Sequence, residues 1–257
     1  MKKSQIDRKT KLYILLGCFF LTNAIVAEFI GSKIFSMELS LGFSQFDWNF
    51  FGVEGLSFDM TCGVILWPFV FVMTDIINEY YGKDGVKRLS YIASGMIAYA
   101  FIVVFLAIQS VPAPWWIESG VEQQVPNMQN AYNKVFGQGL WIIIGSLVAF
   151  LFGQFVDVYV FHWIKKASGD KYLWLRSTGS TLVSQFIDSF IVLFIAFYIG
   201  SNWNFEKVLA IGLMNYIFKF IVAILLTPLL YLLHNLIDNY LGKDKAEKID
   251  SSGGQTI

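Results

Sequence analysis

Two apolar stretches of the sequence carry the same polar insertion, a glutamine followed three residues later by an aspartate. Gln154 precedes Asp157 in one stretch, and Gln185 precedes Asp188 in the next. Residues three apart share one face of a helix, so each pair presents an amide and a carboxylate to the same neighbour. A carboxylate at the centre of a membrane costs about 2.5–3.5 kcal/mol, and contact with lipid would leave that cost uncompensated. The two pairs therefore indicate a polar site enclosed between helices.

Other apolar stretches carry polar side chains as well. Asp75 and Glu79 lie four residues apart, so they also share a helix face. A carboxylate in surroundings of low dielectric can exchange a proton, which makes both residues candidates for proton coupling. Lys219 is either a donor to a ligand or the counter-ion of Asp157 or Asp188. The candidates for substrate binding are Asn23, Gln154, Asp157, Ser180, Gln185, Asp188, Asn215, Tyr216 and Lys219.

The composition indicates which elements hold these groups. The 257 residues are 56% hydrophobic and only 15% charged, whereas soluble domains carry about 25% charged residues. Apolar runs of about twenty residues are long enough to cross a bilayer. The sequence therefore predicts an all-α, polytopic membrane protein with a bundle of six transmembrane helices, near residues 12–35, 60–81, 89–111, 139–164, 173–200 and 208–236.

The charges that flank the spans predict the orientation of the bundle. Lysines and arginines cluster before the first span, between the second and third, between the fourth and fifth, and after the sixth. The other three connections hold mostly Asp and Glu, with Lys134 and Lys207 as their basic residues. Because positive loops stay in the cytoplasm, both termini are expected there. We expect one six-span domain over residues 1–241 and a disordered cytoplasmic tail over 242–257.

Two outer connections are longer than simple turns. Residues 37–59 are rich in aromatic side chains interrupted by glycines, which is typical of an interfacial hairpin; a lid over an outward opening is the alternative. Residues 112–136 include Trp115 and Trp116 and suit an amphipathic segment on the outer leaflet. In the fourth span, Gly145, Ala149 and Gly153 recur every four residues and indicate a close contact with another helix.

Motifs of membrane enzymes are missing from the sequence. There is no His-Glu-x-x-His pair for zinc, no Gly-x-Ser-x-Gly elbow and no Walker lysine. The two histidines, His162 and His234, are too few and too distant for a zinc triad. A mixed set of amides, acids and a lysine also does not suit the rings of like residues that line a channel. We therefore expect a carrier with a site near the midplane, without catalysis, metal or cofactor.

The polar side chains narrow the class of substrate. A carboxylate accepts hydrogen bonds from adjacent ring N–H and exocyclic NH2 groups, while an amide or a lysine donates to a ring carbonyl. Aromatic faces add stacking of about 1–3 kcal/mol per base. These features suit a flat, hydrogen-bonding heterocycle. A cationic amine would also suit an acidic site, and composition does not choose between the two.

Several motifs follow one another along the spans: WPF at 67–69, TDIINEYYG at 74–82, GQFVDVYVF at 153–161, Ser180-Thr181 with Asp188, and Asn215-Tyr216 with Lys219 and Pro228. Each motif alone is weak. In this order and at this spacing they resemble the queuosine precursor transporter family of bacteria, also called the vitamin uptake transporter family. The resemblance covers residues 23–236, nearly the whole membrane part.

The resemblance implies a function. It implies that the chain imports 7-deazaguanine precursors of queuosine, such as preQ0, preQ1 or queuine, across the inner membrane for tRNA modification, as a secondary carrier. The expected partners are a purine-like small molecule and the lipid bilayer, and no nucleic acid is expected. Whether the protein forms a homo-oligomer is left open. The family's functional positions correspond here to Asn23, Asp75, Gln154, Asp157, Ser180, Asp188 and Lys219.

Two other functions remain open from the sequence. Six spans also suit the substrate-binding subunit of a separate ATP-driven complex for vitamin or nucleobase uptake. A membrane assembly or anchoring protein would have the same spans, but its acidic groups would have no ligand.

Overall fold

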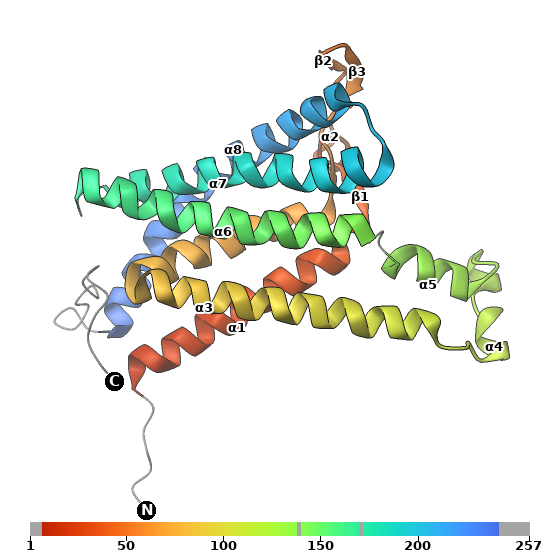
Figure 1. The fold of residues 1–257 in the computed structure, drawn as a ribbon, viewed down its shortest axis with the longest axis horizontal. Coiled ribbons are helices and arrows are strands. Elements are labelled where there is room, and N and C mark those ends of the chain that lie inside the picture. The colour runs from red at the N-terminus through yellow and green to blue at the C-terminus, as the bar shows by residue number, and fades with distance from the viewer. Residues whose placement is uncertain (1–6, 138–139, 170–171, 242–257) are drawn as a thin grey trace, which may run out of the picture.

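The computed structural model describes residues 7–137, 140–169 and 172–241, so the tail predicted at 242–257 lies outside the described residues. Within them, five helices are long and apolar enough to cross a membrane. Figure 1 shows them packed together, and the helical membrane bundle expected from the sequence is confirmed. These helices are α1 (Arg8–Ile30), α3 (Trp67–Gln109), α6 (Leu140–Ser168), α7 (Leu173–Leu193) and α8 (Phe205–Leu241).

Helix α3 folds back on itself at Gly82. This residue has φ 69° and ψ −173°, a conformation that is accessible essentially only to glycine. Figure 1 shows the two parts of α3 running in opposite directions. The span predicted at 60–81 begins too early, because residues 59–65 form β4 and η1; its remainder lies before Gly82, and the span predicted at 89–111 lies in the half of α3 after it. Between the two halves the helical conformation is interrupted at Gly82, and one glycine reverses the chain.

The first helix starts and ends about four to five residues earlier than predicted. Helix α1 ends at Ile30, and strand β1 (Ile34–Ser36) replaces the last helical turn expected there. β1 pairs antiparallel with β4 (Asp59–Thr61). The backbone donors and acceptors of this stretch are therefore satisfied across two strands rather than along a helix.

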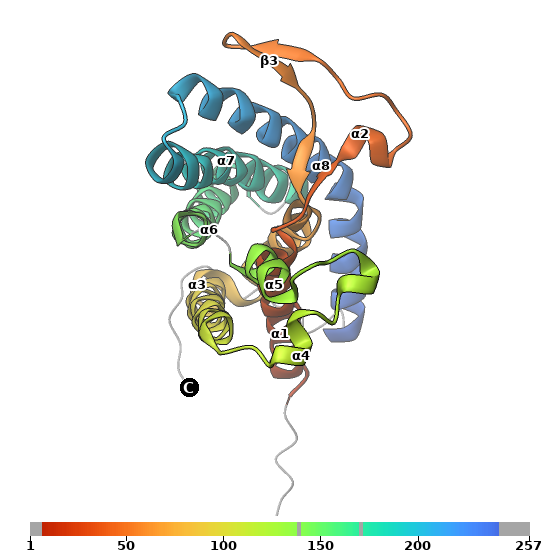
Figure 2. The ribbon, with the colours of Figure 1, turned by 90° about the vertical axis from the view of Figure 1, so that its right-hand side faces the viewer.

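The segment between these strands, residues 37–58, folds onto α8; we call it the outer segment after the side on which the sequence predicts it. It contains α2 (Met37–Ser40) and a hairpin of β2 (Trp48–Phe50) and β3 (Val53–Leu56). Leu56 packs against Ala210 and Met214 of α8, and the ring centroids of Phe58 and Phe218 lie 6.4 Å apart. Figure 2 shows the segment extending beside the end of α8. The outer half of α8 is thus held by a second element besides the bundle.

Short elements complete the connections. The 3-10 turn η1 (Cys62–Ile65) leads into α3. Between α3 and α6 lie α4 (Pro114–Ile117), η2 (Val121–Gln123) and α5 (Met128–Phe136). The π-helical turn η3 (Phe194–Ile199) follows α7 directly.

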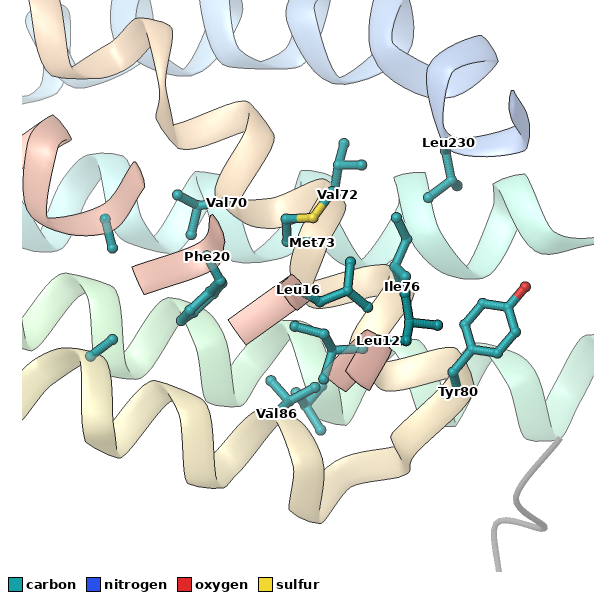
Figure 3. Packing of buried hydrophobic residues seen from close by; sticks show 14 of the residues in the cluster. Leu12, Leu16, Phe20, Val70, Val72, Met73, Ile76, Tyr80, Val86 and Leu230 are labelled. Carbon is teal, nitrogen blue, oxygen red and sulfur yellow. The ribbon is translucent and has the colours of Figure 1, made fainter. Parts of the chain in front are cut away.

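The apolar core lies where α1 meets both halves of α3. Phe20 of α1 belongs to one cluster with Val70 and Ile76, which lie before the reversal, and with Val86, which lies after it (Figure 3). These four side chains are at most 2% exposed. The core therefore fixes the first half of α3, which carries the acidic pair found in the sequence.

Alanine at position 82 tests the reversal of α3. We expect Gly82→Ala to lower the free energy of unfolding by about 1–3 kcal/mol, because a Cβ is strained at this backbone conformation. The control is Gly95→Ala in the second half of α3, where a Cβ meets nothing within 4 Å and alanine favours the helix by about 0.5–1 kcal/mol. Thermal unfolding in detergent measures both. Equal midpoints would contradict the prediction.

Glu38 joins the two ends of the outer segment. Its Oε1 accepts a hydrogen bond of 2.7 Å from the Phe58 backbone N–H, and its Oε2 accepts one of 3.1 Å from the Ser36 hydroxyl. Burial alone would raise the pKa of this carboxyl, but the hydrogen bonds outweigh burial and hold the pKa below its ordinary value. A carboxyl of this kind stabilises the fold above its unfolded pKa of about 4.3. The contribution is lost as the pH falls through the lower folded value.

Glu38→Gln tests this contact. We expect the variant to have a lower thermal midpoint than the wild type at neutral pH, and a smaller further loss as the pH falls below about 4. Thermal unfolding across this pH range measures the difference. The matched control is Glu54→Gln in the same segment, because Glu54 is exposed and should tolerate the change. A Glu38 variant that behaves like the control would show that the contact is not needed.

Candidate functional site

One pocket lies between the first half of α3, α7 and α8. The empty space between its walls is about 440 Å³, which includes the open space at its mouth. The apolar part of its wall includes Phe71, Val72, Ala223, Leu226 and Leu230. An apolar cavity with a few convergent polar groups is the usual form of a ligand site. The polar groups here are Asp75, Ser177, Thr178, Thr181, Gln185, Lys219 and Thr227.

Asp75 brings a carboxylate into the pocket wall. The residue is 4% exposed, and its Oδ2 accepts hydrogen bonds from the hydroxyls of Ser177 and Thr181. Its Oδ1 has no hydrogen-bond partner among the described residues. A buried acceptor without a donor costs about 1–3 kcal/mol or more when charged. A donor group on a ligand in the pocket would therefore stabilise this oxygen.

Helix α7 presents a row of polar side chains to the pocket. Ser177, Thr181 and Gln185 are spaced by four residues, so they form one stripe along the helix. Two other buried hydroxyls bond back to the helix: Ser180 donates to the Ser177 carbonyl, and Ser184 donates to the Thr181 carbonyl, each at 3.0 Å. Gln185 is 4% exposed, and its Nε2 has no partner in the described part of the chain. It can donate to a ligand.

An ion pair closes one side of the pocket. Nζ of Lys219 on α8 lies 2.5 Å from Oδ2 of Asp188 on α7. Asp188 lies against α6 where Gly153 leaves room, since a Cβ at Gly153 would be 3.6 Å from the Cβ of Asp188. The side chains of Lys219 and Asp188 are 10% and 19% exposed, so each compensates the other in a largely dry environment. Lys219 therefore has the counter-ion role considered from the sequence while it also lines the pocket.

Asp157 and Gln154 of α6 form a second layer behind this wall, and neither lines the pocket. Asp157 is fully buried, and its Oδ1 accepts a 3.3 Å hydrogen bond from Ser184. Gln154 accepts a 3.0 Å hydrogen bond from Thr74 of α3. Asp157 Oδ2 and Gln154 Nε2 have no partner among the described residues. The protein therefore leaves part of the hydrogen-bonding capacity of this second layer unused among the described residues.

Glu79 belongs to a separate ionic cluster, one turn beyond Asp75. Its Oε1 accepts a 2.9 Å hydrogen bond from Arg176 of α7, and its Oε2 lies 3.6 Å from Nζ of Lys165 on α6. Arg176 is 1% exposed, and its guanidinium carbon lies 5.8 Å from the ring centroid of Phe161. The cluster thus ties α3, α6 and α7 together.

Three residues expected at the site lie away from the pocket wall. Asn23 is half-buried and donates to the Phe19 carbonyl of its own helix at 2.8 Å. Asn215 and Tyr216 are half-buried on α8, and the ring of Tyr216 packs edge-on against Phe186. The structure therefore brings together Asp75, Gln185 and Lys219 from the expected set, with Ser180, Asp157 and Gln154 directly behind.

Sequence reasoning did not single out the hydroxyl groups of the wall or the role of Arg176. Serine and threonine are common in membrane helices, so the residue type alone is a weak signal. The available signal was the four-residue spacing of Ser177, Thr181 and Gln185, which aligns them with a polar face. Arg176 was counted with the basic residues that flank the fifth span, although it lies inside the bundle.

Removing Arg176 tests the ionic cluster. We expect Arg176→Met to destabilise the protein by about 3–5 kcal/mol, because it removes the guanidinium that pairs with the buried Glu79 carboxylate at 2.9 Å. Lys165→Met should cost about 1 kcal/mol or less, since that pair is longer and more exposed. The double variant Arg176→Met with Glu79→Leu should recover most of the loss. Thermal unfolding in detergent measures these losses of stability. An equal loss for Arg176→Met and Lys165→Met would show that Arg176 is not the main partner of Glu79.

Comparison with known proteins identifies relatives. Residues 61–233 match the family described as "Putative vitamin uptake transporter". A "Probable queuosine precursor transporter" of Bacillus subtilis is 31% identical over 191 residues, covering 73% of this chain and 77% of that protein. A protein of the same name from Haemophilus influenzae is 28% identical over 173 residues, or 66% of each chain. The "Queuosine precursor transporter" of Escherichia coli is 26% identical over 203 residues, covering 78% of this chain and 85% of its own.

No solved structure matches the chain. The family match and the first of these relatives together span most of the membrane part, including every helix that lines the pocket. The resemblance seen in the sequence motifs is therefore confirmed: the chain is a multi-pass bacterial membrane protein that belongs to the vitamin uptake transporter family.

Proposed function

We propose that this protein is a carrier that imports 7-deazaguanine precursors of queuosine across the inner membrane. The names of the three relatives support the substrate class. The pocket supports the same class, because Asp75, which can accept hydrogen bonds, and Gln185 and Lys219, which can donate them, all line it. The observation that carries the proposal is the unsatisfied Oδ1 of Asp75 in the pocket wall.

The hydrogen-bonding edge of a 7-deazaguanine matches these groups. The edge combines a ring N–H and an exocyclic amine with a neighbouring carbonyl oxygen. A carboxylate accepts charge-assisted hydrogen bonds from such donors, and we assign this role to Oδ1 of Asp75, since Oδ2 already accepts from Ser177 and Thr181. Gln185 Nε2 and Lys219 are placed to donate to the carbonyl. Phe71 and the aliphatic wall would contact the faces of the ring, where stacking contributes about 1–3 kcal/mol.

The topology of the proposal has six crossings in one domain. Each half of α3 counts as one crossing, because the helix reverses at Gly82. The two described ends of the chain lie together: Nη1 of Arg8 donates to the Tyr240 carbonyl at 3.2 Å. An even number of crossings agrees with this proximity, and the lysines and arginines at the same end support a cytoplasmic location of both termini.

A secondary carrier must open its site to each side in turn, and α8 has a feature that suits this. The hydroxyls of Thr178 on α7 and Thr227 on α8 lie 3.0 Å apart and join the two helices at the pocket. Pro228 follows at once inside α8, where it removes a backbone donor and permits a bend. We assign the inward opening to a movement of the part of α8 beyond Pro228. The outer half stays attached to the outer segment.

Uptake in a bacterial strain that cannot synthesise queuosine tests the function. The strain is fed preQ0, preQ1 or queuine, and the queuosine content of its tRNA is measured. We expect Asp75→Asn to lower uptake at least about tenfold, since hydrogen bonds to charged groups contribute about 1.5–3 kcal/mol. Asp84→Asn makes the same chemical change at an exposed position just beyond Gly82 and should match the wild type.

The outcomes separate the alternatives. If the wild type imports none of the three compounds while it is present in the membrane, the proposed function is wrong. If Asp75→Asn imports normally, the site is assigned wrongly although the function stands. Loss of uptake on ATP depletion, with the proton gradient maintained, would replace the secondary carrier with an ATP-driven complex.

A further inference from the structure

A second buried carboxylate has no part in the substrate scheme above. Asp157 is 0% exposed and lies behind the pocket wall, outside the reach of a ligand in the pocket. Its Oδ1 accepts from Ser184, while Oδ2 has no hydrogen-bond partner among the described residues. An ionised carboxylate in this position is expensive unless something neutralises it.

The ionic groups around Asp157 are already paired with others. Its own helix α6 carries Lys165, which pairs with Glu79, and His162, whose Nε2 lies 2.9 Å from Oδ1 of Asn78. From α7 it faces the hydroxyls of Ser180, Thr181 and Ser184, and from α3 it faces a second carboxylate, Asp75. The cations nearest to this region are bound elsewhere, in the pairs Glu79–Arg176 and Asp188–Lys219.

We propose that Asp157 is the proton-binding residue that couples transport to the proton gradient. This inference rests on the proposed carrier function and adds its coupling site. The sequence offered Asp75 and Glu79 for this role, but Arg176 and Lys165 neutralise Glu79, and Asp75 lies in the substrate wall. Among Asp75, Glu79, Asp157 and Asp188, Asp157 is the acid that has neither a cation partner nor access to the pocket among the described residues.

The ligand assigned to Asp157 is a proton and not a sodium ion. Carriers that bind sodium near the midplane usually supply backbone carbonyls from interrupted helices. Here α6 is helical from Leu140 to Ser168 and α7 from Leu173 to Leu193, so their backbone carbonyls near Asp157 and Ser184 are used within the helices. A single carboxylate with surrounding hydroxyls is sufficient to hold a proton.

The neighbouring acids explain how the proton and the substrate depend on each other. The hydrogen-bond donors of the substrate compensate Asp75, and a proton from the outer side forms an O–H bond on Oδ2 of Asp157. Only the doubly loaded carrier has both carboxylates compensated, so it can rearrange at the lowest electrostatic cost. On the cytoplasmic side the O–H bond breaks, the proton leaves to water, and the substrate is released.

Proteoliposomes with the full chain test the inference. The membrane potential is clamped at zero, and radiolabelled preQ0, a neutral compound, is the substrate. An inward proton gradient of one pH unit should drive about tenfold accumulation in the wild type if one proton accompanies each substrate. Asp157→Asn should still exchange internal for external preQ0, within about threefold of the wild type, but should accumulate it less than about twofold at any gradient. Asp84→Asn should behave as the wild type.

The other possible results separate failure of the proposed function from failure of the coupling inference. If wild-type vesicles do not exchange preQ0, preQ1 or queuine at all, the proposed function fails. If they exchange but accumulate equally without a proton gradient, or only with a sodium gradient, the function stands and the coupling inference is wrong. Accumulation by Asp157→Asn, or loss of exchange in the correctly folded variant, also overturns it. If the variant does not fold, the pH inside wild-type vesicles is measured after preQ0 is added outside. Proton-coupled uptake should acidify the interior, and a constant pH would refute the inference.

Discussion

The cost of placing charge in hydrocarbon is the constraint on which this structure depends. The bundle meets it in two ways. Glu79 with Arg176 and Asp188 with Lys219 are compensated by opposite charges, and these pairs join neighbouring helices. Asp75 and Asp157 are compensated only by hydroxyl groups, and each keeps one oxygen without a partner in the described part of the chain. The ion-paired acids stabilise the packing of the helices. The acids with an unpaired oxygen keep an electrostatic cost, which binding of a substrate or a proton would lower.

Helix α7 organises both kinds of group. It lies between α6 and α8, and it approaches α6 closely because Gly145 has no side chain: a Cβ there would lie 3.1 Å from the Val192 carbonyl oxygen. One stripe of α7 carries the hydroxyls and amide of the pocket, and an adjacent stripe carries Ser184 toward Asp157. Binding in the pocket can therefore affect Asp157 directly through α7, and no long-range mechanism is needed.

The two halves of α8 are held differently. The outer half packs under the hairpin of the outer segment, where Leu56 contacts Met214, and Glu38 fixes that segment internally. The inner half contacts α7 through Thr227 and through Tyr231, whose hydroxyl accepts from the Trp174 backbone N–H at 3.3 Å. Hydrogen bonds of this kind contribute only about 0.5–1.5 kcal/mol each. The unequal attachment suits a helix that bends at Pro228 while its outer half stays in place.

Properties that depend on short stretches of chain could be predicted from the sequence. Local hydropathy predicted the membrane class and most span limits. The spacing of small and polar residues predicted that Gly145 and Gly153 lie close to another helix and that the acids face inward. The Gly82 reversal was predicted as a loop, since a positive φ at one residue does not show in hydropathy. The limit of the first span was placed too late, because pairing of β1 with β4 competes with the last turn of the helix.

What the tertiary structure decided is which polar groups meet. Arg176 resembled one more basic residue at a membrane edge until the fold placed it against Glu79, 97 residues earlier in the chain. Likewise, Asp75 lines the pocket while Asp157 lies behind it and Asp188 binds Lys219. The sequence by itself determined that costly acids had to be enclosed, because that cost is a property of each residue in its span. Their partners depend on the rotation and tilt of whole helices, and these are set by packing against elements far away in the sequence.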